Sequence, residues 1–325
     1  MQAIQAVIDT NGGPDVIDFR EVELGNPGPG EVLLRHEAVG VNFIDTYHRS
    51  GLYPVPLPSG LGLEAAGVIE DVGEGVDRFR PGDRVATFKS GLGAYSSARI
   101  VNADWLVSLP KEVDFDQAAS LMLKGCTAEA LIERCARVQA GDVVLVHAGA
   151  GATGQIMIRW LAHIGARVVA TASTDEKRQI ALSAGASAVC GYDQDDVMEA
   201  VLAESDGRGA DVVLDGVGAA TWPCSLQAAK CRGLIVSFGN ASGPVTGVKL
   251  GELSSHGSLM VTRPTMMDYY AVREEFDAGT RRLTDMIANG VLRADIGQRL
   301  PLREAAQAHR KLEARETSGA TILVP

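Results

Sequence analysis

An apolar run that leads into a glycine-rich turn is the feature that most restricts the fold of this chain. Residues 143–147 read Val-Val-Leu-Val-His, and residues 149–154 read Gly-Ala-Gly-Ala-Thr-Gly. In a Gly-x-Gly-x-x-Gly turn, the first glycine permits a tight bend and the second lets the backbone approach a pyrophosphate. The third lets a helix pack close to the strand. The pattern predicts a strand, a turn and a helix that bind a dinucleotide.

The residues after the turn complete a β-α-β unit. Residues 155–164 carry apolar side chains at helical spacing, and residues 167–172 have the composition of a second buried strand. The helix N-terminus presents free N–H groups to phosphates. A phosphate-binding loop of nucleotide hydrolases needs Lys and then Ser or Thr after its last glycine, where this chain has Gln155 and Ile156. These neighbours favour dinucleotide binding over an ordinary glycine-rich loop and over nucleotide hydrolysis.

The chain changes character near residue 125. Before it, short β-like runs such as residues 32–35 and 95–101 alternate with Gly and Pro turns, which predicts an antiparallel, partly barrel-like domain. After it, strands and helices alternate as far as residues 259–262, which predicts a parallel, doubly wound sheet. Longer amphipathic helices follow Pro264, and we expect some of them to return to the first domain. A length of 325 residues also favours two domains.

Composition restricts the partners and the location. The formal net charge of −11 provides no basic surface for nucleic acid, and no polybasic cluster indicates a membrane surface, so a small molecule is the expected partner. The N-terminus lacks the basic and apolar regions of a signal peptide, and no apolar run reaches about eighteen residues, which predicts a cytoplasmic protein. The five cysteines are widely spaced and are expected to be buried free thiols.

Several short clusters of residues resemble those of one known family. They lie at residues 42–47, 49–53, 62–67, 81–85, 123–125, 237–240 and 261–264. Together they closely resemble the zinc-free quinone oxidoreductases, the zeta-crystallin-like branch of the medium-chain dehydrogenase/reductase superfamily. The first cluster, Asn-Phe-Ile-Asp-Thr-Tyr, and the last, Val-Thr-Arg-Pro, are typical of the bacterial NADPH:quinone reductases. The resemblance spans nearly the whole chain.

The resemblance implies an α/β fold with two domains. Residues 1–125 and 265–325 would form a groES-like, mainly β catalytic domain, and residues 126–264 a Rossmann domain with a doubly wound parallel sheet. It also implies a cleft between the domains that holds NADPH, and a homodimer formed through the nucleotide domains. The implied reaction is the reduction of a quinone by NADPH without zinc.

The sequence argues against a catalytic metal. Zinc-dependent alcohol dehydrogenases of this superfamily have Cys-x-x-Asp and Gly-His-Glu, where residues 42–45 here read Asn-Phe-Ile-Asp and residues 62–64 read Gly-Leu-Glu. An amide and a leucine cannot build a tetrahedral zinc site, and no cysteine precedes residue 126 to form a structural one. The histidines show no His-Glu-x-x-His spacing. Metal-free chemistry suits an activated acceptor, such as a quinone or an enone, better than an alcohol.

The end of the second predicted strand indicates which nicotinamide cofactor is bound. NAD-binding folds place Asp or Glu there to hold the ribose 2′-hydroxyl, whereas this chain has Ser173, followed by Lys177 and Arg178. These residues suit a 2′-phosphate, although the same charges also fit the solvated first turn of a helix, and Asp175 opposes the phosphate. In the resembling family Lys177 and Tyr192 fall where the 2′-phosphate is contacted, so we predict NADPH.

The candidates for the reacting centre come mainly from one short segment. Tyr47 and Tyr53 combine an apolar ring with a hydroxyl, which suits a quinone and its carbonyl, although such residues also pack in small cores. Asn42 and Asp45 have the composition of a helix cap, and the resemblance places them beside the nicotinamide, with Asn42 in a positioning role. The implied catalytic set is Asn42, Tyr47, Tyr53 and Arg263. Alternatively, Arg263 is only a solvated residue at the end of a strand.

The predicted cofactor contacts come from both domains. They are Phe43, Asp45, Lys124, Thr127, Gly149, Gly151, Ala152, Thr153, Gly154, Ser173, Lys177, Tyr192, Val217, Phe238, Gly239 and Asn240. Alternatively, Lys124 is a charge on the protein surface and does not contact the cofactor. Members of the family usually read Ala-x-x-Gly-Gly-Val-Gly at the turn, so Ala152 and Thr153 are departures. Ala152 would matter only if its position needs a positive φ or must approach the pyrophosphate.

Two other functions fit parts of the pattern. An NADPH-dependent reductase of α,β-unsaturated aldehydes or ketones would need the same hydride delivery and protonation, and related zinc-free reductases act on such double bonds. A nucleotide-sensing or RNA-binding protein is the alternative of another class, since some zeta-crystallin relatives bind RNA. The net negative charge argues against RNA, whose phosphates need clustered Lys and Arg.

Overall fold

The computed structural model describes residues 1–325, which form two compact units. The first unit contains Met1–Leu123 and Arg293–Pro325, and the second contains Lys124–Leu292. The division falls inside helix α2, Phe115–Glu129, which continues as a short π-helix. The domain limits predicted from the sequence stay predictions.

Six parallel strands form the sheet of the second unit. They are β9 Val143–Val146, β10 Arg167–Thr171, β11 Ala188–Cys190, β12 Ala210–Asp215, β13 Ala229–Ser237 and β14 Met260–Thr262. Their spatial order is β11-β10-β9-β12-β13-β14. Numbered along the chain, this is the strand order of a dinucleotide-binding fold, whose switch point lies between β9 and β12. The predicted doubly wound parallel sheet is confirmed.

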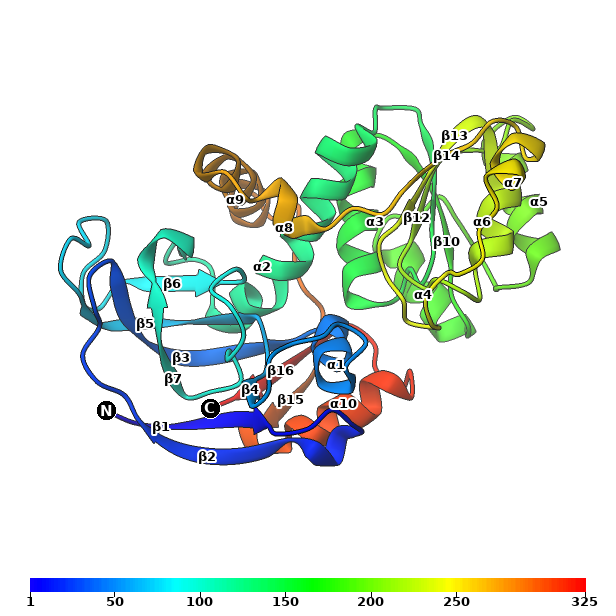
Figure 1. Cartoon of the computed structure of the whole chain (residues 1–325). Helices are drawn as coiled ribbons and strands as arrows, with labels where there is room; N and C mark the ends of the chain where they lie inside the picture. The colour runs from blue at the N-terminus through cyan, green and yellow to red at the C-terminus, as the bar shows by residue number, and fades with distance from the viewer. The chain divides into compact units, whose positions relative to one another are not determined.

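Helices cover both faces of this sheet (Figure 1). They include α3 Ala152–Ile164, α4 Asp175–Ser183, α5 Gln194–Glu204, α6 Trp222–Ala228 and the short α7 Leu250–Ser255. Helices α3 and α4 pack on each other over one face, and α5 packs on α6 over the other. The core between the layers includes Leu145, Val169 and Val213, which are all fully buried. Central strands are apolar throughout because both faces of the sheet are covered.

Helices α8 and α9 also belong to the second unit, although the sequence assigns residues 265–325 to the first domain. Their bounds are Met266–Tyr269 and Arg273–Ala288. The fully buried Glu129 accepts a hydrogen bond from Tyr270 at 2.8 Å and forms an ion pair with Arg282 at 2.5 Å. A buried carboxylate without partners is costly, so these contacts hold residues 265–292 on the helix that ends at Glu129.

Two β-sheets build the first unit. The larger has the order β15-β16-β3-β5-β6-β8, with β7 also paired to β3, and the smaller has the order β2-β1-β4. The bounds are β1 Gln2–Ile8, β2 Asp18–Glu23, β3 Glu31–Val41, β4 Ser59–Gly60, β5 Glu64–Val72, β6 Arg84–Thr87, β7 Ala98–Asn102, β8 Leu106–Ser108, β15 Ile296–Pro301 and β16 Ala320–Val324. Every pair except β15 with β16 is antiparallel. The predicted groES-like, mainly β domain is confirmed.

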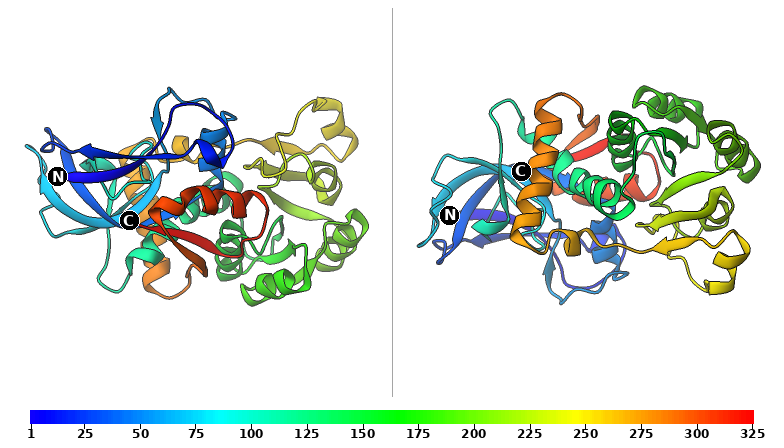
Figure 2. Two further views of the ribbon diagram at one scale, coloured as in Figure 1. Left: turned by 90° about the horizontal axis from the view of Figure 1, so that it is seen from below. Right: turned by 90° about the horizontal axis from the view of Figure 1, so that it is seen from above.

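The end of the chain completes the first unit. Helix α10, Ala305–Glu313, packs against the short 3-10 helix Pro14–Val16 near the N-terminus, and Figure 2 shows α10 beside the N-terminal strands. Leu302 and Ala308 share a core with Ile8 of β1. The C-terminal residues therefore contribute a helix and two strands to the domain that the N-terminal residues begin.

Two properties concern the chain as a whole. No helix combines the length and the apolar composition that a membrane span requires. All five cysteines are free thiols, as expected. Three of them are buried, but Cys135 is half-buried and Cys231 is exposed, so the expectation of burial was wrong for these two.

Candidate functional site

Most of the predicted residues of the second unit gather at one edge of its sheet. Each follows the carboxyl end of a strand: residues 149–154 follow β9, Ser173 follows β10, Tyr192 follows β11, Val217 follows β12, residues 238–240 follow β13, and Arg263 follows β14. The strands are parallel, so these ends share one edge, where open α/β sheets bind ligands. The glycine turn and Val217 flank the switch point between β9 and β12.

Close packing explains two of the three glycines in the turn. A Cβ atom at Gly154 would lie 2.4 Å from the carbonyl oxygen of Ala148, and one at Gly149 would lie 2.8 Å from the Cβ of Ala170. None of the three glycines has a positive φ, whereas Ala148 has a φ of 57°. The left-handed residue of the bend is therefore Ala148, directly before the first glycine.

The two departures from the family turn lie at the start of helix α3. Gly151 is the N-cap, with an extended backbone at φ −68° and ψ 158°, and Ala152 is the first helical residue. Ala152 is not among the residues with positive φ, so an alanine is accommodated without strain there. Gly151 is exposed, which leaves the first turn of α3, including the half-buried Thr153, accessible to an anion.

The residues predicted to select the cofactor lie after β10 and β11. Ser173 and Tyr192 are exposed, and Lys177 in the first turn of α4 is half-buried. Asp175, the carboxylate that would oppose a 2′-phosphate, forms an ion pair with Arg178 at 2.7 Å. This pair, in which the aspartate is exposed and the arginine half-buried, offsets part of the negative charge at the strand end. The region thus combines one lysine with two hydroxyl side chains.

Arg263 holds the loop that follows β13. Its Nη1 atom donates to the carbonyl oxygens of Ser237 at 2.9 Å and Gly239 at 3.0 Å. A Cβ atom at Gly239 would lie 2.1 Å from the carbonyl oxygen of Gly216, and one at Gly216 would lie 2.7 Å from the Phe238 ring. The loops after β12 and β13 are therefore in direct contact, and Arg263 is part of the framework that shapes them.

Two further predicted residues lie on helix α2. Lys124 is only 6% exposed, so it is not the surface charge that the sequence left open. The hydroxyl of Thr127 donates to the sulfur of Met266 at 3.6 Å and thereby links α2 to α8. Both side chains belong to the second unit.

In the first unit, Asn42 and Asp45 fix the start of helix α1, Phe43–Ser50. The backbone N–H of Asn42 donates to Oδ2 of Asp45 at 2.9 Å, which is the capping role that the sequence predicts. The side-chain amide nitrogen of Asn42 donates to Oε2 of Glu64 at 2.9 Å. Both residues are buried, so the position of α1 is fixed by hydrogen bonds on its inner side.

Three aromatic rings lie together on and after α1. The ring centroids of Tyr47 and Tyr53 are 5.1 Å apart, and those of Phe43 and Tyr47 are 5.6 Å apart. Tyr47 is 8% exposed, and the other two rings are half-buried. The backbone N–H of Tyr53 also donates to the carbonyl of Tyr47 at 3.1 Å. The predicted tyrosines form one aromatic group with restricted ring orientations.

A series of buried polar side chains runs behind helix α1. The Tyr95 hydroxyl donates to Oδ2 of Asp45 at 2.9 Å, and Nε2 of His309 donates to the Tyr95 oxygen at 3.0 Å. Arg49 donates to Nδ1 of His309 at 3.1 Å and forms an ion pair with Glu313 at 2.6 Å. Because Tyr95 gives its only hydrogen to Asp45 and arginine cannot accept, His309 must be neutral with its proton on Nε2.

Electrostatics agree with a neutral His309. Burial and the nearby charge of Arg49 lower the pKa of His309 from 6.5 to about 3. Burial also raises the pKa of the Tyr95 phenol well above its usual value, so Tyr95 keeps the hydrogen that it donates to Asp45. Sequence analysis missed these two residues, because they are 214 positions apart and neither lies in a recognisable motif.

The residues at the zinc-site positions of the superfamily do not fit a metal. Leu63 is a buried apolar side chain, and the Asn42 amide is a donor to Glu64. A zinc ligand must instead offer a lone pair to the ion. No group of three or more His, Cys, Asp or Glu side chains is arranged to hold a metal ion anywhere in the chain.

Comparison with known proteins identifies similar chains. The family model described as alcohol dehydrogenase GroES-like domain matches residues 28–111, and the one described as zinc-binding dehydrogenase matches residues 152–285. The quinone oxidoreductase of Pseudomonas aeruginosa is 47% identical over 97% of each chain, and the 2-haloacrylate reductase of a Burkholderia species is 44% identical over 98% of each. The crystal structure of Escherichia coli quinone oxidoreductase complexed with NADPH is 43% identical, with a TM-score of 0.96, and covers 99% of this chain and 100% of that one.

Replacing His309 by Gln should make the free energy of unfolding fall less, as the pH is lowered, than it does in the wild type. The Gln side chain can accept from Arg49 and donate to Tyr95, as the neutral imidazole does. In the wild type the pKa of His309 is about 3 in the folded protein against an ordinary 6.5, so the unfolded chain binds this proton first as the pH falls below 6.5. This residue then lowers the free energy of unfolding by about 2 kcal/mol between about pH 7.5 and 5, and His309→Gln should lack that loss.

Urea unfolding at a series of pH values measures this difference. His163→Gln, at an exposed histidine, is the matched control and should keep the wild-type acid dependence. An equal acid dependence in the wild type and in His309→Gln would contradict the assignment of a neutral His309.

Proposed function

Because the chain belongs to the quinone oxidoreductase family of the medium-chain dehydrogenase/reductase superfamily, we propose that it is an NADPH-dependent quinone reductase that needs no zinc. The observation that carries this proposal is the glycine turn at residues 149–154, at the switch point between β9 and β12. A pyrophosphate bound there would meet the N–H groups and the positive dipole end of α3.

The second unit offers residues for each part of NADPH. Lys177 would bind the 2′-phosphate, with the hydroxyls of Ser173 and Tyr192 as further donors. Val217 and the loop at residues 238–240 would contact the nicotinamide end. The glycine turn would hold the pyrophosphate between them. Bound NADPH supplies the hydride, and the protein supplies its position.

Tyr47 is the residue that we assign to the substrate in the first unit. Its hydroxyl would donate a hydrogen bond to a quinone oxygen, and its ring, held by Phe43 and Tyr53, would pack against the quinone. Asn42 would act by fixing the start of the helix that carries Tyr47. Arg263 would act by fixing the loop after β13, since its Nη1 atom donates to the carbonyl of Ser237 at the end of β13 and to that of Gly239 in the loop.

A second candidate substrate is a carbon–carbon double bond activated by a carbonyl or carboxylate group. The observation that favours it is the 44% identity to a protein named 2-haloacrylate reductase. Such an acceptor needs the same hydride and proton as a quinone, so the residues proposed above serve both reactions. Measuring turnover with each acceptor distinguishes the two candidate substrates, whereas the arrangement of residues does not.

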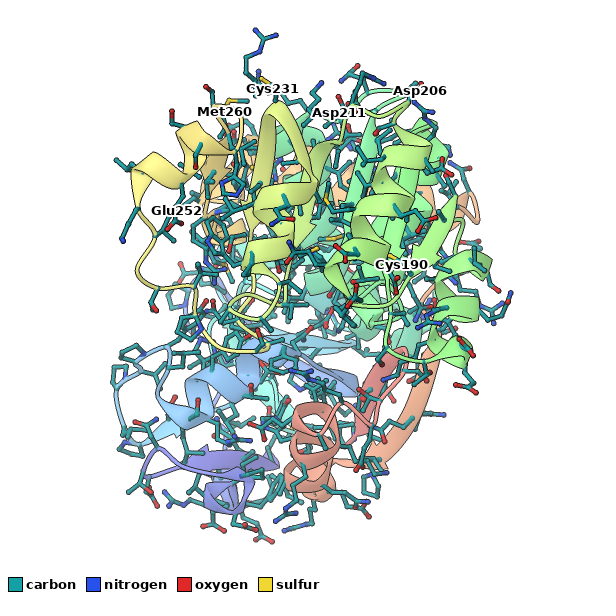
Figure 3. The ribbon with its side chains drawn as sticks, turned by 90° about the vertical axis from the view of Figure 1, so that its right-hand side faces the viewer. Cys190, Asp206, Asp211, Cys231, Glu252 and Met260 are labelled. Carbon is teal, nitrogen blue, oxygen red and sulfur yellow. The ribbon has the colours of Figure 1, made fainter.

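We also propose a homodimer formed through the edge strand β14. This strand has a partner only on its β13 side, and Met260 and Val261 are 55% and 38% exposed. Figure 3 shows Met260 at the side of the second unit, away from Cys190 of the opposite edge strand. An exposed edge with apolar side chains is suited to pair with the same edge of a second copy.

The cysteines bear on the location of the protein. Five free thiols fit the proposed cytoplasmic location, where reductants keep cysteines unpaired.

The test of function is the oxidation of NADPH by the purified protein with a simple quinone, or with 2-chloroacrylate, as the acceptor. We expect turnover with the quinone. Tyr47→Phe, which removes only the hydroxyl, should lower kcat/KM for the quinone by about tenfold to a hundredfold. Tyr269→Phe, at a half-buried tyrosine outside the proposed site, is the matched control. Turnover with 2-chloroacrylate alone would favour the second candidate, and no turnover with either would contradict both.

Cofactor selection is tested by Lys177→Met, which keeps the length of the side chain and removes its charge. We expect the KM for NADPH to rise about tenfold to a hundredfold, because a charge-assisted bond to phosphate is lost, while the KM for NADH stays unchanged. Lys249→Met, at an exposed lysine of the same unit, controls for the loss of a positive charge. An equal rise for NADH would show that Lys177 does not select the phosphate.

The dimer is tested by light scattering on the protein eluting from a sizing column. We expect the mass of two chains for the wild type and of one chain for the double variant Met260→Asp with Val261→Asp, since like charges would face each other across the paired edges. Leu202→Asp, at a residue of similar exposure on α5, should leave the mass unchanged. A monomeric wild type would rule the proposal out.

A further inference from the structure

Buried polar side chains form a connected group beneath the glycine turn. Four of them, His147, Thr171, Asp215 and Ser225, are named the His147 network here, and none is more than 3% exposed. The buried Thr221 also donates to Asp215, at 2.9 Å. The Ser225 hydroxyl donates to Oδ2 of Asp215 at 2.7 Å, and Nε2 of His147 lies 3.1 Å from the Ser225 oxygen. Nδ1 of His147 lies 3.2 Å from the Thr171 hydroxyl. The network therefore joins the carboxyl ends of β9, β10 and β12 to helix α6.

The hydrogens in the network have one consistent arrangement. Ser225 gives its only hydrogen to Asp215, so His147 must donate from Nε2 to Ser225 and accept at Nδ1 from Thr171. Burial lowers the pKa of His147, which agrees with a neutral ring. The serine lies between carboxylate and imidazole, whereas in a hydrolase triad the imidazole lies between the other two. The network is thus a fixed set of hydrogen bonds and contains no activated nucleophile.

Both ends of the network bond the backbone of turns at the switch point. At one end, the Thr171 oxygen accepts from the N–H of Ala148 at 3.1 Å, and Ala148 is the residue with a φ of 57°. At the other end, Oδ1 of Asp215 accepts from the N–H groups of Val217 at 2.9 Å and Gly218 at 3.0 Å. A left-handed alanine is unfavourable and persists only where surrounding contacts hold it.

We propose that the His147 network is a positioning device that sets the affinity for NADPH. This inference rests on the proposed function, because it takes NADPH as the ligand. None of its four side chains belongs to the proposed contact set, yet together they hold the turn before α3 and the loop that contains Val217. These two segments flank the switch point, so a break in the network displaces the groups that receive the pyrophosphate and the nicotinamide end of the dinucleotide.

Two substitutions break the network with little change of shape. Thr171→Val keeps the volume and removes the hydroxyl bonded to Ala148 and His147, whereas Thr171→Ser retains that hydroxyl. Ser225→Ala removes the link between His147 and Asp215. Ser205→Ala is the matched control, because Ser205 is also fully buried in the second unit and accepts from Gly209 N–H at 2.9 Å. Its neighbour Asp206 lies far from Cys190, which ends β11 at the cofactor edge (Figure 3).

The measurement is the Kd for NADPH from the fluorescence of the bound nucleotide, without any acceptor, together with kcat at saturating NADPH. We expect Thr171→Val and Ser225→Ala each to raise Kd about tenfold, equivalent to about 1.4 kcal/mol, with kcat within about twofold of the wild type. Thr171→Ser and Ser205→Ala should stay within about twofold in Kd. Because the network acts as one unit, the double variant Thr171→Val with Ser225→Ala should also lose about tenfold, well short of the hundredfold of independent sites.

Other results would overturn the inference. An unchanged Kd in both network variants, an equal rise in Ser205→Ala, or fully additive losses in the double variant would show that the network only stabilises the fold. Melting temperatures of all variants separate weak binding from unfolding, and Thr171→Ser provides the rescue if Thr171→Val folds poorly. A wild type that binds NADPH but reduces no acceptor would contradict the proposed reaction and leave this inference standing. A wild type that does not bind NADPH would overturn both.

Discussion

The second unit depends on the close approach of helix α3 to the end of strand β9. At Gly154 even a methyl group would reach within 2.4 Å of the Ala148 carbonyl oxygen, a distance at which the backbone has to move. Glycine there lets the helix begin directly over the switch point, so its free N–H groups face the place where two strands diverge. The strained conformation of Ala148 follows from the same constraint, because the chain must reverse before the helix can start.

Each unit supports its functional turn with buried polar side chains that contain a neutral histidine. In the first unit His309 connects Arg49 to Tyr95 behind α1, and in the second His147 connects Thr171 to Ser225 beneath the glycine turn. Burial lowers the pKa of both rings. Neither therefore exchanges a proton near neutral pH, and both act as fixed donors and acceptors. In the first unit, the Tyr47 hydroxyl is the proposed hydrogen-bond donor to the substrate.

Sequence patterns predicted the features that depend on residues close together in the chain, namely the strands, the helices and the glycine turn. The alternation of strands and helices after residue 125 is the doubly wound sheet, and the glycine spacing identified the turn at its switch point. Contacts between distant residues could not be predicted in this way. Asp215 and His147 each stand at the end of an apolar strand, which was the available signal, but their link through Ser225 depends on how α6 packs. Similarly, Glu129 keeps α9 with the second unit through partners more than 100 residues away.

The contacts of Glu64 explain why activated acceptors suit this chain. Glu64 is fully buried, and it accepts hydrogen bonds from the Asn42 amide at 2.9 Å and the Leu123 N–H at 2.7 Å. In the zinc-dependent pattern of the superfamily, residue 42 would be a thiolate and residue 63 an imidazole. Here the buried carboxylate accepts hydrogen bonds from a side-chain amide and a backbone N–H, which offset part of the cost of its burial. Substrate polarisation is then left to hydroxyl and amide donors, which are weaker than a Lewis acid. Both proposed acceptors, a quinone and an activated double bond, take a hydride readily and need little polarisation.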